Sequence, residues 1–403
     1  MTATEARPYP FSTPRRLDAE PLLATLRTQT TIRVRLPYGE PAWLITRYED
    51  VKLVLSDPRF SRAAGAGRDQ PRMRPFFAPP GSIMDLDPPD HSRLRRLVAK
   101  AFTVRRIEQL RPRAQQVADE LVDAMVAKGP PADLVEDFAL QLPVTVICDL
   151  LGVPEEDRAT YRMWSEAFVP TTRYAPEKVR ECLMQLSGYL ADLIAQRGKT
   201  PTDDLLGALV AARDNDDRLG DRELLGLVQS MILAGHETTA SQITNFVYVL
   251  LTHPNQLAEL RADPGLLPRA VEELQRFIPL SVLGAIPRYA LADVELNGVL
   301  VKAGDAVLPV LPSANRDESV YTDPERLDLR RAEATHLNFG HGPHHCLGAP
   351  LARMELQVAL GTLLKRLPGL RIAGPEADIE WKDGLGVRGP ADLPISWDGT
   401  PGR

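Results

Sequence analysis

Apolar residues recur at helical spacing through most of this 403-residue chain. They stand three and four positions apart, so each series falls on one face of a helix. Alternation with a period of two, which is typical of a half-buried strand, is confined to residues 31–36, 294–301 and 306–310. The middle segment contains Asn297-Gly298, a dipeptide typical of a tight hairpin turn. The pattern predicts a mainly α fold with small β-sheets.

The longest helical pattern begins at Asp221, taken as the N-cap, and ends near Thr252, where Pro254 stops it. With a rise of about 1.5 Å per residue, such a helix would be about 45 Å long. Its middle, Ala-Gly-His-Glu-Thr-Thr at 234–239, is polar although both flanks are apolar. Glycine lowers helix propensity and threonine can donate to the carbonyl four residues earlier, so both loosen a helix. On its own the segment indicates either a kinked or solvated turn or a functional notch.

A loop with two spaced glycines precedes the last predicted helix, 349–367. The loop, 339–348, reads Phe-Gly-His-Gly-Pro-His-His-Cys-Leu-Gly. Gly340 and Gly342 allow the backbone to turn sharply and its amides to approach a sulfur atom or a flat ligand. Gly348 removes a side chain where the helix would approach that ligand. Cys346 lies just before a helix N-terminus, where free N–H groups and the helix dipole stabilise a thiolate.

Two other interpretations of Cys346 are open at this point. A lone cysteine is most often a small buried apolar residue, but such a residue does not need a Gly-x-Gly loop before it. A zinc site formed by Cys346 and the histidines at 341, 344 and 345 is the other. Three successive residues do not easily converge on one tetrahedral ion, however, and no CxxC or HxxxH pair supports such a site.

The complete pattern FGxGxHxCLG resembles the proximal loop of the cytochromes P-450. The resemblance implies the cytochrome P-450 fold and makes Cys346 the axial thiolate ligand of the iron in haem b (iron protoporphyrin IX). A thiolate pushes electron density onto the iron and favours O–O cleavage. Phe339, Gly340 and Gly348 then belong to the cofactor-binding loop.

The polar segment of the long helix is similar to the oxygen-binding notch, AGxET, of the same family. By this resemblance Ala234 and Gly235 leave room above the haem, and Thr238 hydrogen-bonds the bound dioxygen. Glu237 relays protons from solvent, and an acid beside an alcohol suits general acid catalysis. Many relatives carry Asp at this position, which is a conservative difference. Glu237 and Thr238 are therefore the predicted catalytic residues.

Cationic side chains are needed where the two haem carboxylates are buried. A predicted helix that starts after Pro88-Pro89-Asp90 places His91 and Arg95 four residues apart on one face. The resemblance assigns both to the haem propionates, through the family pattern DPPDHxRLRRLV. It adds Arg288 and His344 as two further propionate partners.

The resemblance also makes Glu273 and Arg276, three residues apart on a helix, a structural ExxR pair whose third member is Arg326. The segment 60–80 is rich in Gly, Arg and Pro and is predicted to be a long surface loop. By position relative to the motifs, we expect the substrate pocket to be lined from 62–83, 233–234 and 282–286.

Composition and charge narrow the choice of partners. The chain is 44% hydrophobic and 25% charged, as in ordinary globular proteins. A net charge of −6 argues against nucleic acid as a general partner. No run of about eighteen apolar residues occurs, so we expect no membrane anchor. The cysteines at 148, 182 and 346 lack disulfide spacing and fit a reducing cytoplasm.

No repeat or composition shift divides the chain, and no GxGxxG-like nucleotide loop occurs. We therefore expect one cytochrome P-450 domain over 1–403 without a fused reductase. Electrons would come from NAD(P)H through a ferredoxin reductase and a ferredoxin. Basic residues on and after the helix of His91 are the expected docking patch on a monomer: Arg93, Arg96, Lys100, Arg105 and Arg106.

The expected activity is monooxygenation, in which one atom of O2 enters a hydrophobic small molecule as a hydroxyl or epoxide and the other leaves as water. Likeness to soluble bacterial members that tailor polyketides and macrolides points to secondary metabolites and antibiotic biosynthesis. The alternatives are a peroxide-using or nitric oxide reductase-like haem-thiolate enzyme, and a non-catalytic haem sensor. The pair Glu237-Thr238 argues against the first alternative.

Overall fold

The structure of the protein is a computed structural model, and it falls into two compact units. Unit 1 comprises Met1–Arg93 and Glu272–Cys346, and unit 2 comprises Leu94–Val271 and Leu347–Arg403. The expected single domain over the whole chain stays a prediction. The residues that the structure describes are 5–13, 15–73, 82–99, 102–166, 175–202, 204–214, 219–282, 286–333, 335–382 and 386–399.

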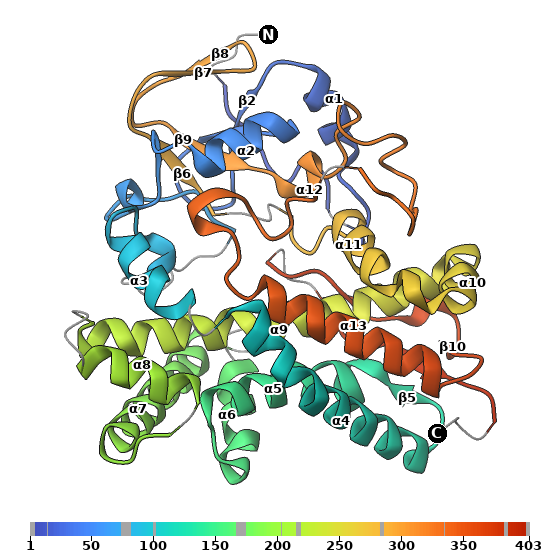
Figure 1. Cartoon of the computed structure of the whole chain (residues 1–403). Coiled ribbons are helices and arrows are strands. Elements are labelled where there is room, and N and C mark those ends of the chain that lie inside the picture. Colours follow the sequence, from blue (N-terminus) through green and yellow to red (C-terminus); the bar gives the residue numbers. More distant parts are fainter. Residues whose placement is uncertain are drawn as a thin grey trace. The chain divides into compact units, whose positions relative to one another are not determined.

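A six-stranded mixed sheet organises unit 1, with strand order β1-β2-β3-β9-β6-β4 (Figure 1). The β1–β2 and β3–β9 pairs are parallel, and the other three pairs are antiparallel. A separate two-stranded hairpin turns at Asn297-Gly298, where both residues have positive φ. The strands are β1 (Arg7–Pro8), β2 (Ile32–Arg35), β3 (Ala42–Ile45), β4 (Phe60–Ser61), β6 (Arg288–Ala290), β7 (Val294–Leu296), β8 (Val299–Val301) and β9 (Ala306–Pro309).

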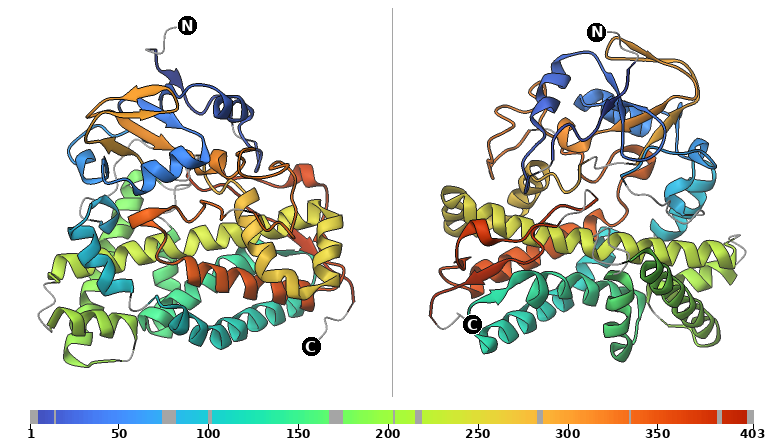
Figure 2. Two further views of the ribbon diagram at one scale, coloured as in Figure 1. Left: turned by 45° about the horizontal axis from the view of Figure 1, so that its top comes forward. Right: turned by 180° about the vertical axis from the view of Figure 1, so that it is seen from behind.

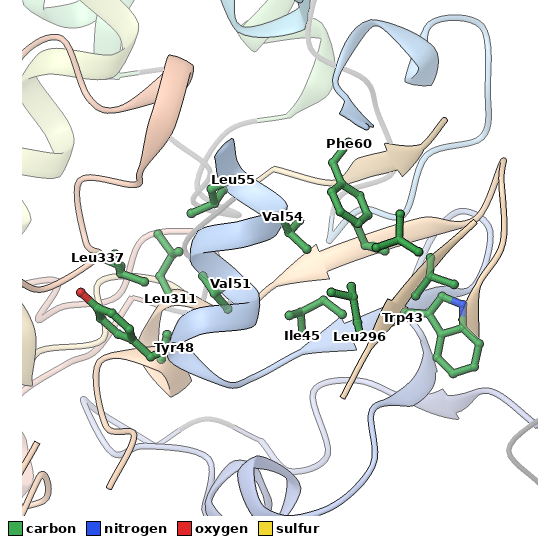
Figure 3. Close-up of a cluster of buried hydrophobic side chains, with 14 of the residues drawn as sticks. Trp43, Ile45, Tyr48, Val51, Val54, Leu55, Phe60, Leu296, Leu311 and Leu337 are labelled. Atoms are coloured by element: carbon green, nitrogen blue, oxygen red, sulfur yellow. The ribbon is translucent and has the colours of Figure 1, made fainter. Parts of the chain in front are cut away.

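Helix α2 (Tyr48–Ser56) provides one side of the hydrophobic core of unit 1 (Figure 3). Its Val51 and Val54 are fully buried in the same cluster as Ile45 of β3. All four residues of β3 are buried, because both faces of this central strand are covered. The strand therefore lacks the alternation that marks a half-buried strand, and the sequence pattern did not predict it.

The remaining elements of unit 1 are short. They are α1 (Pro21–Thr28), α12 (Leu311–Ala314) and the single turns η1 (Ala63–Gly65), η2 (Ile83–Asp85) and η6 (Gly342–His344). Two helices contain the points at which the chain passes from one unit to the other, α3 (Asp90–Ala99) and α11 (Leu267–Phe277).

Unit 2 is built around the long helix α9 (Asp221–Thr252), which packs against α5 (Gln141–Leu151) and α13 (Ala349–Arg366) (Figures 1 and 2). Helix α13 also packs along α4 (Val104–Lys128). A small three-stranded sheet has the order β10-β11-β5. The other elements are β5 (Ala132–Asp133), η3 (Val135–Ala139), η4 (Glu155–Asp157), α6 (Arg158–Glu166), α7 (Pro176–Lys199), α8 (Leu205–Asp214), α10 (Pro254–Ala262), η5 (Pro264–Leu266), β10 (Arg371–Ile372), η7 (Glu376–Asp378) and β11 (Pro394–Ser396).

The predicted mainly α class is confirmed, and so are the helices predicted at 221–252 and 349–367. The predicted N-cap of the first of these helices is wrong. Gly220, not Asp221, is the N-cap of α9, and its N–H donates to the Glu223 carboxylate at 2.9 Å. Asp221 is instead the first helical residue, where its charge is favourable to the helix dipole. The end is as expected, because Pro254 begins α10 directly after Thr252 and His253.

The prediction of a surface loop over 60–80 is wrong in its first part. Phe60 and Ser61 form β4, which pairs with β6, and both are buried together with Arg62. Asp87 holds this segment, because its carboxylate accepts from the Arg62 N–H at 2.9 Å. Residues 74–81 lie outside the described part of the chain.

Within the described residues, no helix combines the length and the apolar composition that crossing a membrane requires.

Candidate active site

The loop that carries Cys346 is closed by its own backbone. Gly340 N–H donates to the Leu337 carbonyl at 2.7 Å, and Cys346 N–H donates to the Phe339 carbonyl at 2.7 Å. Cys346 is exposed, whereas Cys148 and Cys182 are buried. Burial raises the pKa of Cys148 to about 12, so this thiol does not ionise near neutral pH. Of the three cysteines, Cys346 alone is placed to bind a metal as a thiolate.

Gly342 is required where the loop passes the end of α2. Its φ is 69°, in the region that favours glycine. A Cβ atom at this position would lie 2.7 Å from the Leu55 carbonyl oxygen and 2.8 Å from Ser56 Cα. These contacts are with backbone atoms, which cannot turn aside. The second glycine of the motif therefore fits the loop against α2 within unit 1.

Four cationic or titratable side chains act on one another in unit 1: the buried Arg62, His91 and Arg288, and the half-buried His344. The rings of His91 and His344 lie with their centroids 4.1 Å apart. Burial, together with the charges of His91, Arg288 and Arg62, lowers the pKa of His344 to about 3. Burial and repulsion from Arg62 lower the pKa of Arg288 to about 9. The structure thus brings together three predicted propionate partners.

This cluster is short of anions. Arg288 is 4% exposed, and among the described residues its guanidinium contacts only the Ile286 carbonyl, at 3.0 Å. Both ring nitrogens of His344 are buried without a hydrogen-bond partner in the same part of the chain. A buried guanidinium without a carboxylate is costly. The two carboxylates of a haem fit this cluster, which supports the cofactor that the sequence implied.

Sequence reasoning missed Arg62 as a member of the cluster. Arg62 is 5% exposed and contacts the Asp85 carboxylate at 3.3 Å. Burial lowers the pKa of Arg62 to about 10, partly offset by Asp85. No motif marks this arginine, since it lies in a segment whose composition indicated a surface loop. Only the pairing of the preceding strand, β4, with β6, which carries Arg288, would have placed it.

The remaining predicted cofactor residues keep their expected elements. Arg95 is half-buried on α3, one turn after His91. Phe339 is half-buried, with its ring centroid 5.6 Å from that of His336. Gly348 is the N-cap of α13.

The third member of the ExxR triad is Arg331, and the prediction of Arg326 is wrong. Glu273 and Arg276 form a buried ion pair at 2.7 Å. Arg331 Nε lies 3.2 Å from the same Glu273 carboxylate. Arg326 contributes only its backbone carbonyl to Arg276, and its exposed side chain pairs with Asp328. The motif placed the loop correctly, but its spacing could not decide between two arginines five residues apart.

The polar segment of α9 lies in unit 2 and remains helical throughout. Thr238 Oγ1 donates to the Ala234 carbonyl at 2.9 Å, and Thr239 Oγ1 donates to the Gly235 carbonyl at 3.0 Å. Ala234 is exposed, and the nearest atom to a Cβ at Gly235 would be Ile147 Cδ1 at 3.9 Å. The two residues therefore add little side-chain bulk to the helix surface beside Thr238, and their role above a haem stays a prediction.

Glu237 has a partner that the sequence did not reveal. Lys382 Nζ lies 2.5 Å from Glu237 Oε1, and the two side chains are 9% and 7% exposed. Ser241 Oγ donates to the same oxygen at 3.3 Å and accepts from Lys382 Nζ at 2.9 Å. Lys382 stands in no recognisable motif and is 145 positions from Glu237. Only the packing of the segment after α13 on α9 brings it there.

Two expectations for the site receive less support. Parts of the expected pocket lining, residues 74–81, 283–285 and the Leu233 side chain, lie outside what the structure describes. For the zinc alternative, no group of three or more His, Cys, Asp or Glu side chains is placed to hold a metal ion within the described ranges.

Comparison with known proteins shows the family of the chain. The profile of the family described as Cytochrome P-450 matches residues 31–368. Mycinamicin IV hydroxylase/epoxidase from Micromonospora griseorubida is 52% identical over 398 residues, which is 98% of this chain and 100% of the relative. Nocardicin C N-oxygenase from Nocardia uniformis subsp. tsuyamanensis is 53% identical over 399 residues, with the same coverage.

A solved structure is equally similar. A mutant of the mixed-function P-450 MycG in complex with mycinamicin IV superimposes with a TM-score of 0.93 at 52% identity, covering 98% of this chain and 100% of that one. The exposed loop cysteine and the buried cations of unit 1 fit this result. The similarity over the whole length shows that the chain belongs to the cytochrome P-450 family of haem-thiolate monooxygenases.

Proposed function

We propose that this protein is a monooxygenase of secondary metabolism that oxidises a hydrophobic small molecule of the macrolide or polyketide type. The observation that carries this proposal is the anion-deficient cluster of Arg288 and His344 in the unit that presents Cys346. The family supplies the cofactor class, and relatives that tailor natural products supply the substrate class.

The residues that would hold the haem follow from chemistry already described. Cys346 would bind the iron as a thiolate, and His91, Arg95, Arg288 and His344 would bind the propionates. When bound, the haem supplies dioxygen activation with electron donation from the thiolate. Phe339, Gly340 and Gly348 shape the loop, while Ala234 and Gly235 keep the helix surface open.

Thr238 and Glu237 would manage protons. Because the Thr238 hydroxyl donates to the Ala234 carbonyl, its oxygen remains a hydrogen-bond acceptor. It can therefore hold a water molecule or another proton-bearing group beside the open surface of α9. Glu237, the next residue back, is the acid that exchanges protons with solvent. An enzyme that consumes peroxide or reduces nitric oxide would have no need of this pair.

The electron donor, the assembly state and the compartment are also proposals. We infer that a ferredoxin, reduced by NAD(P)H through a ferredoxin reductase, docks on exposed Arg96, Arg105 and Arg106, although the protein is acidic overall. Lys100 of the expected patch lies outside the described residues. We infer a monomer, and a cytoplasmic location is supported by three cysteines that form no disulfide in the described part of the chain.

A substrate screen tests the proposal. The purified haem protein would be titrated with mycinamicin IV, nocardicin C and a set of unrelated macrolides, and the Soret band followed for the shift that displacement of a water ligand causes. A positive compound would then be turned over with ferredoxin under isotopically labelled O2. We expect one labelled oxygen atom in the product. Product that carries no label, or formation driven by peroxide alone, would contradict monooxygenation.

A second reaction type is favoured by one observation. The nocardicin relative is named an N-oxygenase and is as similar to this chain as the macrolide enzyme. Oxidation at nitrogen is therefore the second candidate, and a labelled N–O product from nocardicin C would select it.

A further inference from the structure

Two buried arginines oppose each other where the edge strand β4 pairs with β6. Ser61 pairs with Tyr289 in this antiparallel ladder, so one further step places Arg62 opposite Arg288. Both arginines are buried, and repulsion from Arg62 contributes to the lowered pKa of Arg288. Like charges directly opposite each other on neighbouring strands destabilise a sheet. Other contacts must therefore hold the segment that carries Arg62 in place.

Two aspartates provide part of this hold. The Asp87 carboxylate accepts from the Arg62 backbone N–H at 2.9 Å and from the Ser61 hydroxyl. The Asp85 carboxylate contacts the Arg62 guanidinium at 3.3 Å, but its side chain is 42% exposed. Water screens a half-exposed ion pair, so its attraction is weak. Asp85 alone does not balance two buried arginines.

A second set of contacts lies on the opposite face of β6. Tyr289 follows Arg288 in this strand, so its side chain points to the other face of the sheet. The Arg68 guanidinium lies over the Tyr289 ring, 4.1 Å from its centroid. The Glu40 carboxylate joins the two, because one oxygen accepts from Arg68 at 2.7 Å and the other from the Tyr289 hydroxyl at 2.7 Å. Arg68, Glu40 and Tyr289 are called the latch below.

The latch is connected to Arg62 by the short turn η1. Gly65 N–H donates to the Arg62 carbonyl at 3.1 Å, and Arg68 N–H donates to the Gly65 carbonyl at 3.1 Å. Gly65 also lies against the Tyr289 ring, since a Cβ atom at this position would be 2.9 Å from its Cε2 atom. The turn is therefore held on β6 at its end by Arg68, and Arg62 stands directly at its start.

We propose that Arg62 is a further cationic partner of the haem carboxylates, and that the latch positions it from the opposite face of the sheet. A carboxylate bound by both Arg62 and Arg288 would relieve the repulsion between them. Arg68 is a positioning residue, because it acts through η1 on Arg62. This inference rests on the haem binding that the proposed function requires.

The rate of haem loss tests the proposal without turnover. Transfer of haem from the holoprotein to excess apomyoglobin would be followed by absorbance. We expect Arg62→Met to speed haem loss about tenfold and Arg68→Met about threefold. Arg33→Met is the matched control, because Arg33 lies 5.4 Å from the Trp43 ring centroid and 3.6 Å from the Asp305 carboxylate, but on β2. The control is expected to leave the rate unchanged.

Equal acceleration by Arg68→Met and Arg33→Met would overturn the proposal, even if Arg62→Met does not fold. A double-mutant cycle then separates positioning from a general loosening of the sheet. If the latch acts through Arg62, adding Arg68→Met to Arg62→Met does not speed haem loss further. Additive effects of the two changes would overturn the positioning role.

The reduction potential of the haem is the second readout. Loss of a nearby positive charge favours the ferric state, so Arg62→Met is expected to lower the potential. Arg62→Lys keeps the charge and is expected to preserve the potential. Arg68→Met is expected to lower it by a smaller amount, and Arg33→Met to leave it unchanged. An unchanged potential in Arg62→Met would overturn the inference. A haem protein that yields no labelled product would instead refute the proposed monooxygenase function and leave these results standing.

Discussion

The role of a buried charged side chain in this protein depends on whether a group of opposite charge lies beside it. Arg288 is buried and His344 half-buried among other cations, and burial together with these neighbouring charges lowers the pKa of each. Glu237, by contrast, is buried together with a cation, because Lys382 Nζ contacts its carboxylate. The first pattern fits the proposed binding site for the haem carboxylates, and the second is a buried ion pair. Both readings depend on partners far away in the chain.

Replacing Thr238 tests the proposed path of proton delivery. Thr238→Ala removes the hydroxyl that would hold a proton-bearing group, so we expect normal haem content and substrate affinity but a coupling ratio of product to NAD(P)H lowered by about tenfold. Thr239→Ala removes the same kind of hydrogen bond from a buried position one residue later and serves as the control. Equal coupling in the two variants would mean that proton delivery runs elsewhere.

Glu355 provides a prediction about pH and stability. This glutamate on α13 is 1% exposed, and burial raises its pKa well above the usual 4.5. The folded protein thus holds a proton that the unfolded chain releases once the pH exceeds about 4.5. Stability from this group is present at low pH and lost as pH rises. Glu355→Gln is expected to gain stability relative to the unmodified protein by about 1.4 kcal/mol per pH unit above that value. The two proteins would be compared by urea unfolding at several pH values. A difference in unfolding free energy that does not change with pH would contradict this expectation.

The sequence pattern predicted those helices and turns whose formation depends on residues close together in the chain. The helices α9 and α13 and the hairpin at Asn297-Gly298 follow from periodicity and turn chemistry, although the N-cap of α9 did not. The strand β3 was missed because it is buried on both faces, and β4 because composition outweighed its pairing with β6. Such elements are specified by partners distant in sequence, and a local pattern cannot reveal them.

The loop at Gly342 offers a test of an element. Gly342→Ala combines a positive φ with clashes against the end of α2, so we expect a loss of about 2–4 kcal/mol in unfolding free energy and reduced haem retention. Gly67→Ala is the matched control, since Gly67 has φ 74° and open space around it. It is expected to cost only about 1 kcal/mol and to leave haem content intact. Equal effects at the two positions would mean that the approach to α2 does not matter.

For the whole molecule, the motifs pointed to the candidate site residues but not to the charged side chains that contact them. Cys346, His91, Arg288 and His344 came from residue patterns. Arg62, Lys382 and Arg331 did not, because each acts on a predicted residue from a remote segment without a motif of its own. Burial and pairing are properties of the folded chain, so these three required a structure.

The proposed docking of ferredoxin is a property of the whole surface. Charge reversal by Arg96→Glu with Arg105→Glu is expected to slow reduction by ferredoxin about tenfold at low salt, with a smaller effect at high salt, because surface charges mainly steer association. Reduction by dithionite is expected to stay normal. The control is Arg222→Glu with Arg261→Glu, which changes the net charge equally on other exposed arginines. If both pairs slow reduction alike, net charge and not the patch is responsible.

We expect Cys346 to bind the haem iron as a thiolate, and every other role proposed for the site depends on that bond. The most direct test is the absorption spectrum of the reduced, carbon monoxide-bound protein, recorded for the unmodified chain and for Cys346→Ser, Cys148→Ser and Cys182→Ser. We expect the red-shifted Soret band of a haem thiolate in the unmodified protein and in the variants of the two buried cysteines, and its loss in Cys346→Ser. A band that survives in Cys346→Ser, or that is absent from the unmodified haem protein, would contradict the account.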